Sequence, residues 1–405
     1  KRCEVPTEYG ANQYVNEFYN IRATVDGIEL PFITGLDLKH KVNSARIATV
    51  TVENREALEM LRVGGVITIN FGLSDAYANK TIKFEEGTNL GVPHTPNPND
   101  FYGLIKIIKP GLQKTTFTAL DLISSLATSR IDNIQYQDYG KQDMYMVAKD
   151  ICDYGDIDVS HLDSSMKYGN SVNEGKLNQQ HNIYGYQTRK SFLDKLFNLM
   201  SFNPNDTNQY KSDSTPSETN MSDPFPFIEF YYAIRQGKQI DFFAPNRFDK
   251  RAKPVLKVGP NEANVIGAGL VGTIDASKLI NSVTISSDSD FARKVTIEDG
   301  ASIEKYGVSA RNFQFKSSDT TTMNEAAFVI LNKFKNPATT YTMELTEAEW
   351  IQLGDLVEVS SPLLGTKELF PVVEKQLTVT DRVITKLAVG SASLEPKELL
   401  ELVQR

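Results

Sequence analysis

The sequence has 405 residues, of which 40% are hydrophobic and 23% charged, and its formal net charge is −8. This length predicts two to three domains with a sizeable core, and the ordinary composition excludes collagen, coiled coil and wholesale disorder. The acidic balance argues against tight nucleic-acid binding, which needs clustered Lys and Arg.

In the first third of the chain, apolar and polar residues alternate as they do in antiparallel strands. A tight hairpin is predicted across Asp26-Gly27, because both residues tolerate positive φ. Asp121 is expected to be the N-cap of a short helix at 122–127. The other elements predicted here are strands at 32–40, 45–52, 66–71, 101–108 and 114–119, a short helical stretch at 55–61 and a polar loop at 87–100.

The middle of the chain combines helices with polar stretches. Helices are predicted at 143–154 and 191–202, where apolar residues recur at helical spacing. The stretch 203–223 contains no Val, Ile, Leu or Phe. It cannot bury enough apolar area to order itself, so we predict a mobile surface loop at 203–225.

The last third returns to strands. One strong helix is predicted at 322–335, where Asn336-Pro337 stops it, and a terminal helix is predicted at 396–403. The predicted strands are 227–235, 239–243, 279–286, 294–298, 311–316, 340–345, 356–359, 369–379 and 382–389.

Two distant segments follow one order of elements: strand, short connector, glycine step, strand and hairpin. The step is Gly64-Gly65 in the first segment and Gly354-Asp355 in the second, and glycine suits a sharp turn into a new strand. An apolar-Gly-Asp step before a strand also occurs in unrelated β-barrels. We predict an internal duplication whose turn positions are Gly64, Gly65, Gly103, Gly354 and Asp355.

The order of several motifs resembles the hub proteins of phage contractile tails. That family includes the late-control protein D group and the hub portion of type VI secretion spike proteins. The resemblance extends roughly over 20–389. It is carried by FYGLI at 101–105, TFTALD at 116–121, LINSVTI at 279–285, VTIED at 295–299, SIEKYG at 302–307 and the step at Leu353-Gly354-Asp355.

The resemblance implies a mainly β fold with an α+β insert: two tube-like antiparallel β-barrel domains in one chain plus an inserted mixed domain. The expected domains are 17–129 (first tube-like β-barrel), 130–275 (inserted α+β domain with the mobile loop 203–225), 276–390 (second tube-like β-barrel with helix 322–335) and 391–405 (C-terminal helix or tail).

The resemblance also implies a structural baseplate hub that is not an enzyme and needs no cofactor or metal. Three chains with two barrels each would present six near-equivalent barrels. A homotrimer would thus adapt the sixfold tail tube to the threefold central spike and let DNA or effector pass. The implied partners are a tail tube protein above, a spike protein below, and baseplate wedge or tape-measure proteins. DNA would be passing cargo only, and membrane binding is not expected.

The implied location is the tail baseplate of a virion, assembled in the host cytoplasm. No secretory signal opens the chain, and because it starts at Lys1 rather than Met, native N-terminal residues are expected to precede it. Two other interpretations stay open. One is a distal-tail or hub protein of a non-contractile tail. The other is an unrelated β-rich carbohydrate-binding protein or hydrolase.

Several patterns imitate functional motifs. The glycines of 267–272 match the letters of a dinucleotide fingerprint, but the sequence predicts a turn before them and a strand soon after, so we expect a connector. Asp153, Asp156 and Asp158 do not follow the spacing of an EF-hand. Cys3 and Cys152 lack CxxC spacing. The four histidines (His40, His94, His161 and His181) are scattered without a zinc-binding pair.

Overall fold

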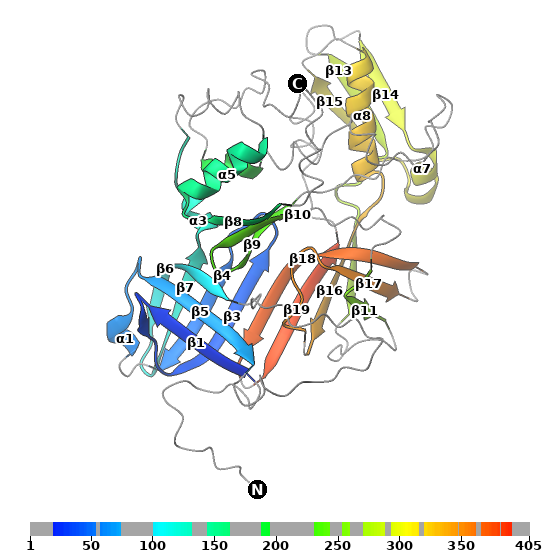
Figure 1. Ribbon diagram of the computed structural model, residues 1–405. Coiled ribbons are helices and arrows are strands. Elements are labelled where there is room, and N and C mark those ends of the chain that lie inside the picture. The colour runs from blue at the N-terminus through cyan, green and yellow to red at the C-terminus, as the bar shows by residue number, and fades with distance from the viewer. Residues whose placement is uncertain are drawn as a thin grey trace.

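The computed structural model describes residues 19–53, 57–73, 100–131, 144–162, 188–194, 231–243, 253–259, 270–287, 293–315, 320–346, 348–361, 366–380 and 382–390. The chain is mainly β, with one 13-stranded sheet and two three-stranded sheets (Figure 1). The predicted loop at 203–225 and the predicted terminal helix lie outside the described residues.

The N-terminal half of the large sheet, here called the N-terminal barrel, has the strand order β3-β4-β7-β6-β5-β1-β2. Alternate residues of these strands face one core that includes Ile69, Phe71 and Phe117, all fully buried. Its strands are β1 (Tyr19–Val25), β2 (Ile28–Glu29), β3 (Ile33–Lys41), β4 (Ile47–Glu53), β5 (Val66–Leu73), β6 (Phe101–Pro110) and β7 (Lys114–Asp121), with the short helix α1 (Ala57–Met60) between β4 and β5.

The C-terminal half, here called the C-terminal barrel, has the order β12-β16-β19-β18, and β17 pairs with β18 and β11. It has a core of its own, in which the rings of Tyr341 and Phe370 lie 5.3 Å apart. Its strands are β11 (Leu256–Val258), β12 (Val271–Asp275), β16 (Ala338–Leu345), β17 (Leu356–Ser361), β18 (Thr366–Val379) and β19 (Val383–Gly390).

The two barrels repeat one scheme of strand pairing. β4 pairs with β7, β7 with β6 and β6 with β5; in the same way β16 pairs with β19, β19 with β18 and β18 with β17. β3 and β12 take the same place, each antiparallel to the first strand of its set. At the far edge the barrels differ, since β1 is antiparallel to β5 whereas β11 is parallel to β17. The fold is therefore duplicated, as the sequence predicts.

β18 joins the barrels into one sheet, because its last residues also pair with β3. The pairing is antiparallel and runs from Glu374 opposite Lys41 to Val379 opposite Leu36. Figure 1 shows the two barrels side by side, blue to cyan for the N-terminal one and orange to red for β16–β19 of the C-terminal one.

A third unit, here called the α/β layer, consists of helices and two small sheets, and its β9 and β10 lie next to the barrels (Figure 1). Its first sheet has the order β8-β10-β9 and its second the order β14-β13-β15, and both contribute to one apolar core. The elements are α3 (Ile123–Leu126), α5 (Met144–Tyr154), β8 (Asp158–Leu162), β9 (Tyr231–Gln236), β10 (Gln239–Phe243), β13 (Ser282–Ser287), β14 (Lys294–Glu298), α7 (Gly300–Tyr306), β15 (Ala310–Phe315) and α8 (Thr320–Phe334). The stretch from β13 to α8, expected within the second barrel domain, thus forms a separate sheet that α8 packs against.

Local signals predicted most elements, with three differences. Asp26 and Gly27 have φ of 51° and 84°, as the predicted hairpin requires. Leu122, not Asp121, takes the N-cap position of α3, although Asp121 Oδ1 accepts from the Ile123 amide at 3.0 Å. The sequence did not predict the strands β8, β11 and β12 or the helix α7. Of the predicted helix 191–202, the described residues reach only to 194, and helical backbone begins at 189.

Candidate assembly interface

The two glycine steps have nearly the same backbone geometry. Gly64 has φ +85° and Gly354 has φ +86°, in the region that L side chains rarely adopt. The Gly64 amide donates to the Ile105 carbonyl at 2.8 Å, and the Gly354 amide donates to the Val372 carbonyl at 2.8 Å. Each step therefore ties the start of a strand (β5 or β17) to the neighbouring long strand (β6 or β18).

The residue after each glycine accepts a hydrogen bond from the same residue of the long strand. The Ile105 amide donates to the Gly65 carbonyl at 3.0 Å, and the Val372 amide donates to the Asp355 carbonyl at 2.9 Å. The register of β6 and of β18 against its hairpin partner then shifts directly after this residue. Asp355 closes its own turn, because its Oδ2 accepts from the Gln352 amide at 2.8 Å.

The surroundings of the two steps differ. A Cβ at Gly64 would meet no atom within 4 Å, whereas a Cβ at Gly354 would lie 2.5 Å from the Phe243 ring and 2.8 Å from Arg235 Nη2. Arg235 and Phe243 belong to β9 and β10 of the α/β layer. The second step is therefore packed beneath that layer, and the first is open.

Gly103 lies within β6 rather than in a turn. It pairs with Ile67 and Asp121, and a Cβ there would come within 2.3 Å of the Leu120 carbonyl oxygen. The strand registers place Phe370 at the equivalent position of β18, because Phe370 pairs with Val357 as Gly103 pairs with Ile67. Phe370 therefore corresponds to Gly103, not to Phe101, the first residue of β6.

Polar side chains line a small cavity where the two barrels meet. His40, Arg46, Arg235 and Lys375 line it together with apolar residues and Gln352, and none of the lining residues is acidic. Arg46 Nη1 donates to the Asp100 carbonyl at 2.6 Å. His40 is buried, and burial lowers its pKa well below the ordinary value. Four basic side chains from three parts of the chain thus meet at the β3–β18 joint.

Backbone oxygens and buried carboxylates balance part of this charge. Lys375 Nζ donates to the Ile351 carbonyl at 2.7 Å and to the Glu349 carbonyl, and burial lowers the pKa of Lys375 to about 7. Asp121 Oδ2 accepts from the Arg46 amide at 2.8 Å, and burial raises the pKa of Asp121 to about 7. Since a buried charge without partners costs several kcal/mol, these contacts hold the joint in one arrangement.

Sequence reasoning missed this joint, although one signal was present. Lys375 lies on the same inward face of β18 as Leu377 and Val379. His40 lies on the same inward face of β3 as Leu36 and Leu38. A charged residue at an inward position of a strand marks a site that needs a partner.

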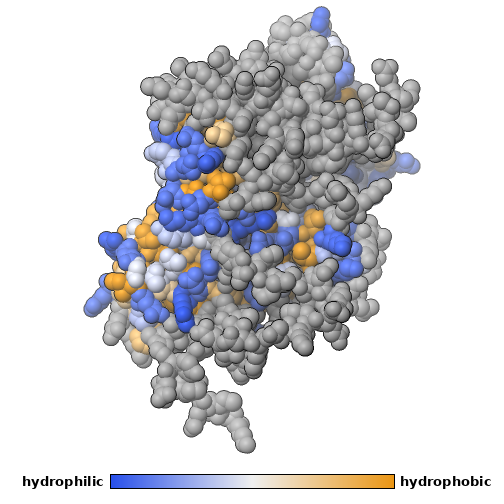
Figure 2. Space-filling model, in the orientation of Figure 1, coloured by the Kyte–Doolittle hydropathy of each residue, from blue (hydrophilic) through white to orange (hydrophobic). Residues whose placement is uncertain are grey.

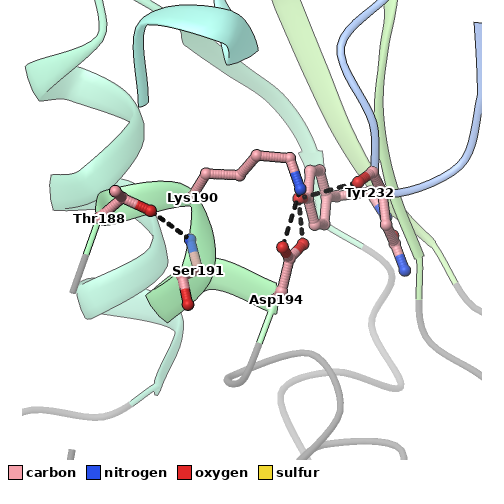
Figure 3. Close-up of polar contacts among 6 residues, drawn as sticks. Thr188, Lys190, Ser191, Asp194 and Tyr232 are labelled. Carbon is pink, nitrogen blue, oxygen red and sulfur yellow. Dashed lines mark hydrogen bonds and ion pairs between the residues drawn. The ribbon is translucent and has the colours of Figure 1, made fainter. Parts of the chain in front are cut away.

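The α/β layer is attached to the N-terminal barrel through Asn43. Tyr232 of β9 donates its amide to Asn43 Oδ1 and accepts the Asn43 amide at its carbonyl, both at 2.9 Å. The Tyr232 hydroxyl donates to Asp194 Oδ1 at 2.5 Å, and Lys190 Nζ lies 2.8 Å from Asp194 Oδ2 (Figure 3). Burial raises the pKa of Tyr232 well above its ordinary value. On the same strand Arg235 Nη2 donates to the Leu353 carbonyl at 2.5 Å, so β9 contacts both barrels.

Some of the patterns that imitate ligand motifs fall within the described ranges. No group of three or more His, Cys, Asp or Glu in them could hold a metal ion. Gly272 of the dinucleotide-like run lies in β12, opposite Tyr341. Burial raises the pKa of the Cys152 thiol to about 12. Within the same ranges, no helix combines the length and apolar character needed to span a membrane.

Neither a protein-family model nor a curated sequence matches the chain, but solved structures of tail proteins share its fold. The tail protein from Neisseria meningitidis MC58 has a TM-score of 0.60 at 11% identity, with 94% of this chain and 99% of that chain covered. The 43 kDa tail protein of prophage MuSo2 from Shewanella oneidensis has a TM-score of 0.58 at 11% identity, with the same coverage.

A third similar structure is the prophage tail protein gp18 from Listeria monocytogenes EGD-e. Its TM-score is 0.51 at 10% identity, with 95% of this chain and 98% of that chain covered. In all three pairs the alignment spans nearly the whole of both chains, so the likeness includes both barrels and the α/β layer. The chain therefore has the fold of prophage tail proteins.

Proposed function

We propose that the chain is a structural hub of the tail baseplate in a contractile phage or related injection particle. As a homotrimer it adapts the sixfold tail tube to the threefold spike and lets DNA or effector pass. The observation that supports this most is the doubled pairing scheme, with its two matching glycine steps, in one polypeptide. Three such chains offer six barrels to a sixfold ring.

The fold of the similar tail proteins supports a structural role in a tail. The proposed neighbours are a tail tube protein on one side, a spike protein on the other, and wedge or tape-measure proteins around them. The proposed site of action is the virion baseplate, assembled in the host cytoplasm, and the proposed role is not enzymatic. We also propose the domain boundaries at 129/130 and 390/391, with the sheet β13–β15 and α8 as a subdomain of its own. The boundary expected at 275/276 is moved, because β11 and β12 lie before it and pair with strands of the C-terminal barrel.

Native mass spectrometry and electron microscopy of the purified chain test the proposal. We expect a particle of three copies of the 45.2 kDa chain, seen as an annulus with a pseudo-sixfold face. A stable monomer at micromolar concentration, or one with affinity for a glycan, would favour the unrelated β protein instead.

A particle of three copies that binds the tube protein of a non-contractile tail, and no contractile one, would favour the distal-tail alternative. Tube proteins of both kinds, immobilised and tested at equal salt, separate these two outcomes.

A further inference from the structure

The joint between the barrels shows which strand edges connect one barrel to the next. It uses the second half of β18, from the C-terminal barrel, and the free edge of β3, from the N-terminal barrel. Both strands keep their place in their own barrels, because β18 still pairs with β19 and β3 still pairs with β4. Pairing across the joint therefore adds contacts without opening either barrel.

The duplication assigns each of these edges a counterpart in the other barrel. The counterpart of β18 is β6, since both follow the glycine step and carry the same register shift. The counterpart of β3 is β12, since both flank the first strand of the repeat. Among the described residues, β12 ends the sheet, and beyond Ile105, which bonds Gly64 and Gly65, no backbone pairing is recorded for β6 on the side away from β7.

Both counterpart edges expose apolar side chains. All five residues of β12 are exposed, and Val271 and Ile274 are each 54% exposed. Ile107 on β6 is 49% exposed, and Leu112 in the following turn is fully exposed. Figure 2 shows apolar side chains among polar ones over the N-terminal barrel. An exposed edge strand of this kind is a template for pairing with another chain.

We propose that β6 of one copy pairs antiparallel with β12 of the next copy, in the register of the internal joint. This rests on the proposed homotrimer and names its interface. Aligning the two joints through their ladders places Ile107 opposite Asp275 and Ile108 opposite Ile274. The contact is head-to-tail, and in the proposed homotrimer three such contacts close a ring in which internal and intermolecular joints alternate.

The joint inside the chain pairs basic side chains, whereas the proposed joint between chains pairs apolar ones. Inside the chain one pair of the joint is Lys375 and His40, both buried. Between chains the equivalent pair is Ile108 and Ile274, which lose water-exposed apolar area on contact. Pro110 has no amide hydrogen to donate, so the pairing is expected to end at this residue.

Disulfide trapping tests this register. The variant carries Ile107→Cys and Asp275→Cys, both exposed positions, in a chain with Cys3→Ser; Cys152 is buried. Opposed residues of an antiparallel pair lie within the Cα range of a disulfide, so mild oxidation should yield species of two and three chain masses on denaturing gels. The matched control pairs Ile107→Cys with Ile274→Cys, whose side chains face opposite sides of the sheet, and should yield at most a tenth as much.

The possible outcomes test the pairing of β6 with β12 separately from the proposed homotrimer. A trimer by native mass whose Ile107→Cys and Asp275→Cys residues stay reduced overturns the pairing and leaves the trimer intact. A chain that is monomeric at every concentration overturns both.

A charge substitution gives an independent measurement. Ile274→Lys should raise the trimer dissociation constant at least tenfold, whereas Val308→Lys, at a 70% exposed residue of the α/β layer, should leave it unchanged. Equal dissociation constants for both variants and the unmodified chain would contradict the proposed interface.

Discussion

The two barrels share one scheme of strand pairing but differ in the side chains that fill their cores. Tyr341 of β16 and Phe370 of β18 form an aromatic pair in the C-terminal barrel. The registers place Ala48 and Gly103 at the equivalent positions of the N-terminal barrel. Strand connectivity and the glycine step persist because they follow from backbone geometry, whereas core side chains can change together if volume is kept.

The glycine steps give the sharpest contrast. Gly354→Ala adds a methyl group against Phe243 and Arg235 at a positive φ, so strain and steric clash add. We expect the free energy of unfolding to fall by about 3–5 kcal/mol. Urea denaturation of the purified chain measures this, and assembled oligomer should fall in parallel on size exclusion. An effect under 1 kcal/mol would show that Phe243 moves aside at no cost.

At the joint between the barrels, we expect Lys375 of the C-terminal barrel to make the free energy of unfolding depend on pH. Burial lowers the pKa of Lys375 to about 7, so between pH 7 and 10 the unfolded chain binds more protons than the folded one at this residue. Its contribution makes the free energy of unfolding rise with pH in this window, by up to about 1.4 kcal/mol per pH unit. Lys375→Met should remove this contribution when denaturation is compared at pH 7, 8, 9 and 10. The contribution of Lys333, whose pKa burial also lowers to about 7, should remain.

Ile108 is the equivalent residue of the N-terminal barrel and provides the matched control. Ile108→Met keeps a nonionisable side chain there, so the slope between pH 7 and 10 should match that of the unmodified chain. If Lys375→Met also keeps the full slope, the amino group stays charged in the folded chain.

The open step should respond less than the packed one. Gly64→Ala carries the cost of the positive φ alone, because nothing lies within 4 Å of the new methyl group. We expect a loss of about 1–2 kcal/mol by the same urea titration. Equal losses at Gly64 and Gly354 would mean that the α/β layer does not constrain the second step.

An effect no larger than that at Gly64 is expected where β9 attaches to the N-terminal barrel. Tyr232→Phe removes the hydroxyl that bonds Asp194 and the Asn43 carbonyl, but keeps both backbone bonds to Asn43. We expect a loss of about 1–2 kcal/mol and faster amide hydrogen exchange at 190–194. Unchanged exchange there would show that Lys190 alone orders Asp194.

The sequence by itself determined the local elements and their repetition. Positive φ at Asp26-Gly27 and at Gly64 and Gly354 follows from residue type, because few other residues tolerate it. The strands of the repeat could be placed from alternation within single segments. The same order of elements around Gly64 and Gly354, which are 290 residues apart, indicates the duplication.

Only the tertiary structure decided how the pieces join. No local pattern indicates that β18 pairs with β3, since that contact links residues more than 300 positions apart. The same holds for the separate sheet β13–β15, and for β12, whose five exposed residues lack the alternation that marks a half-buried strand. Long-range pairing depends on which edges and apolar faces become adjacent after folding, and that information is spread over the whole chain.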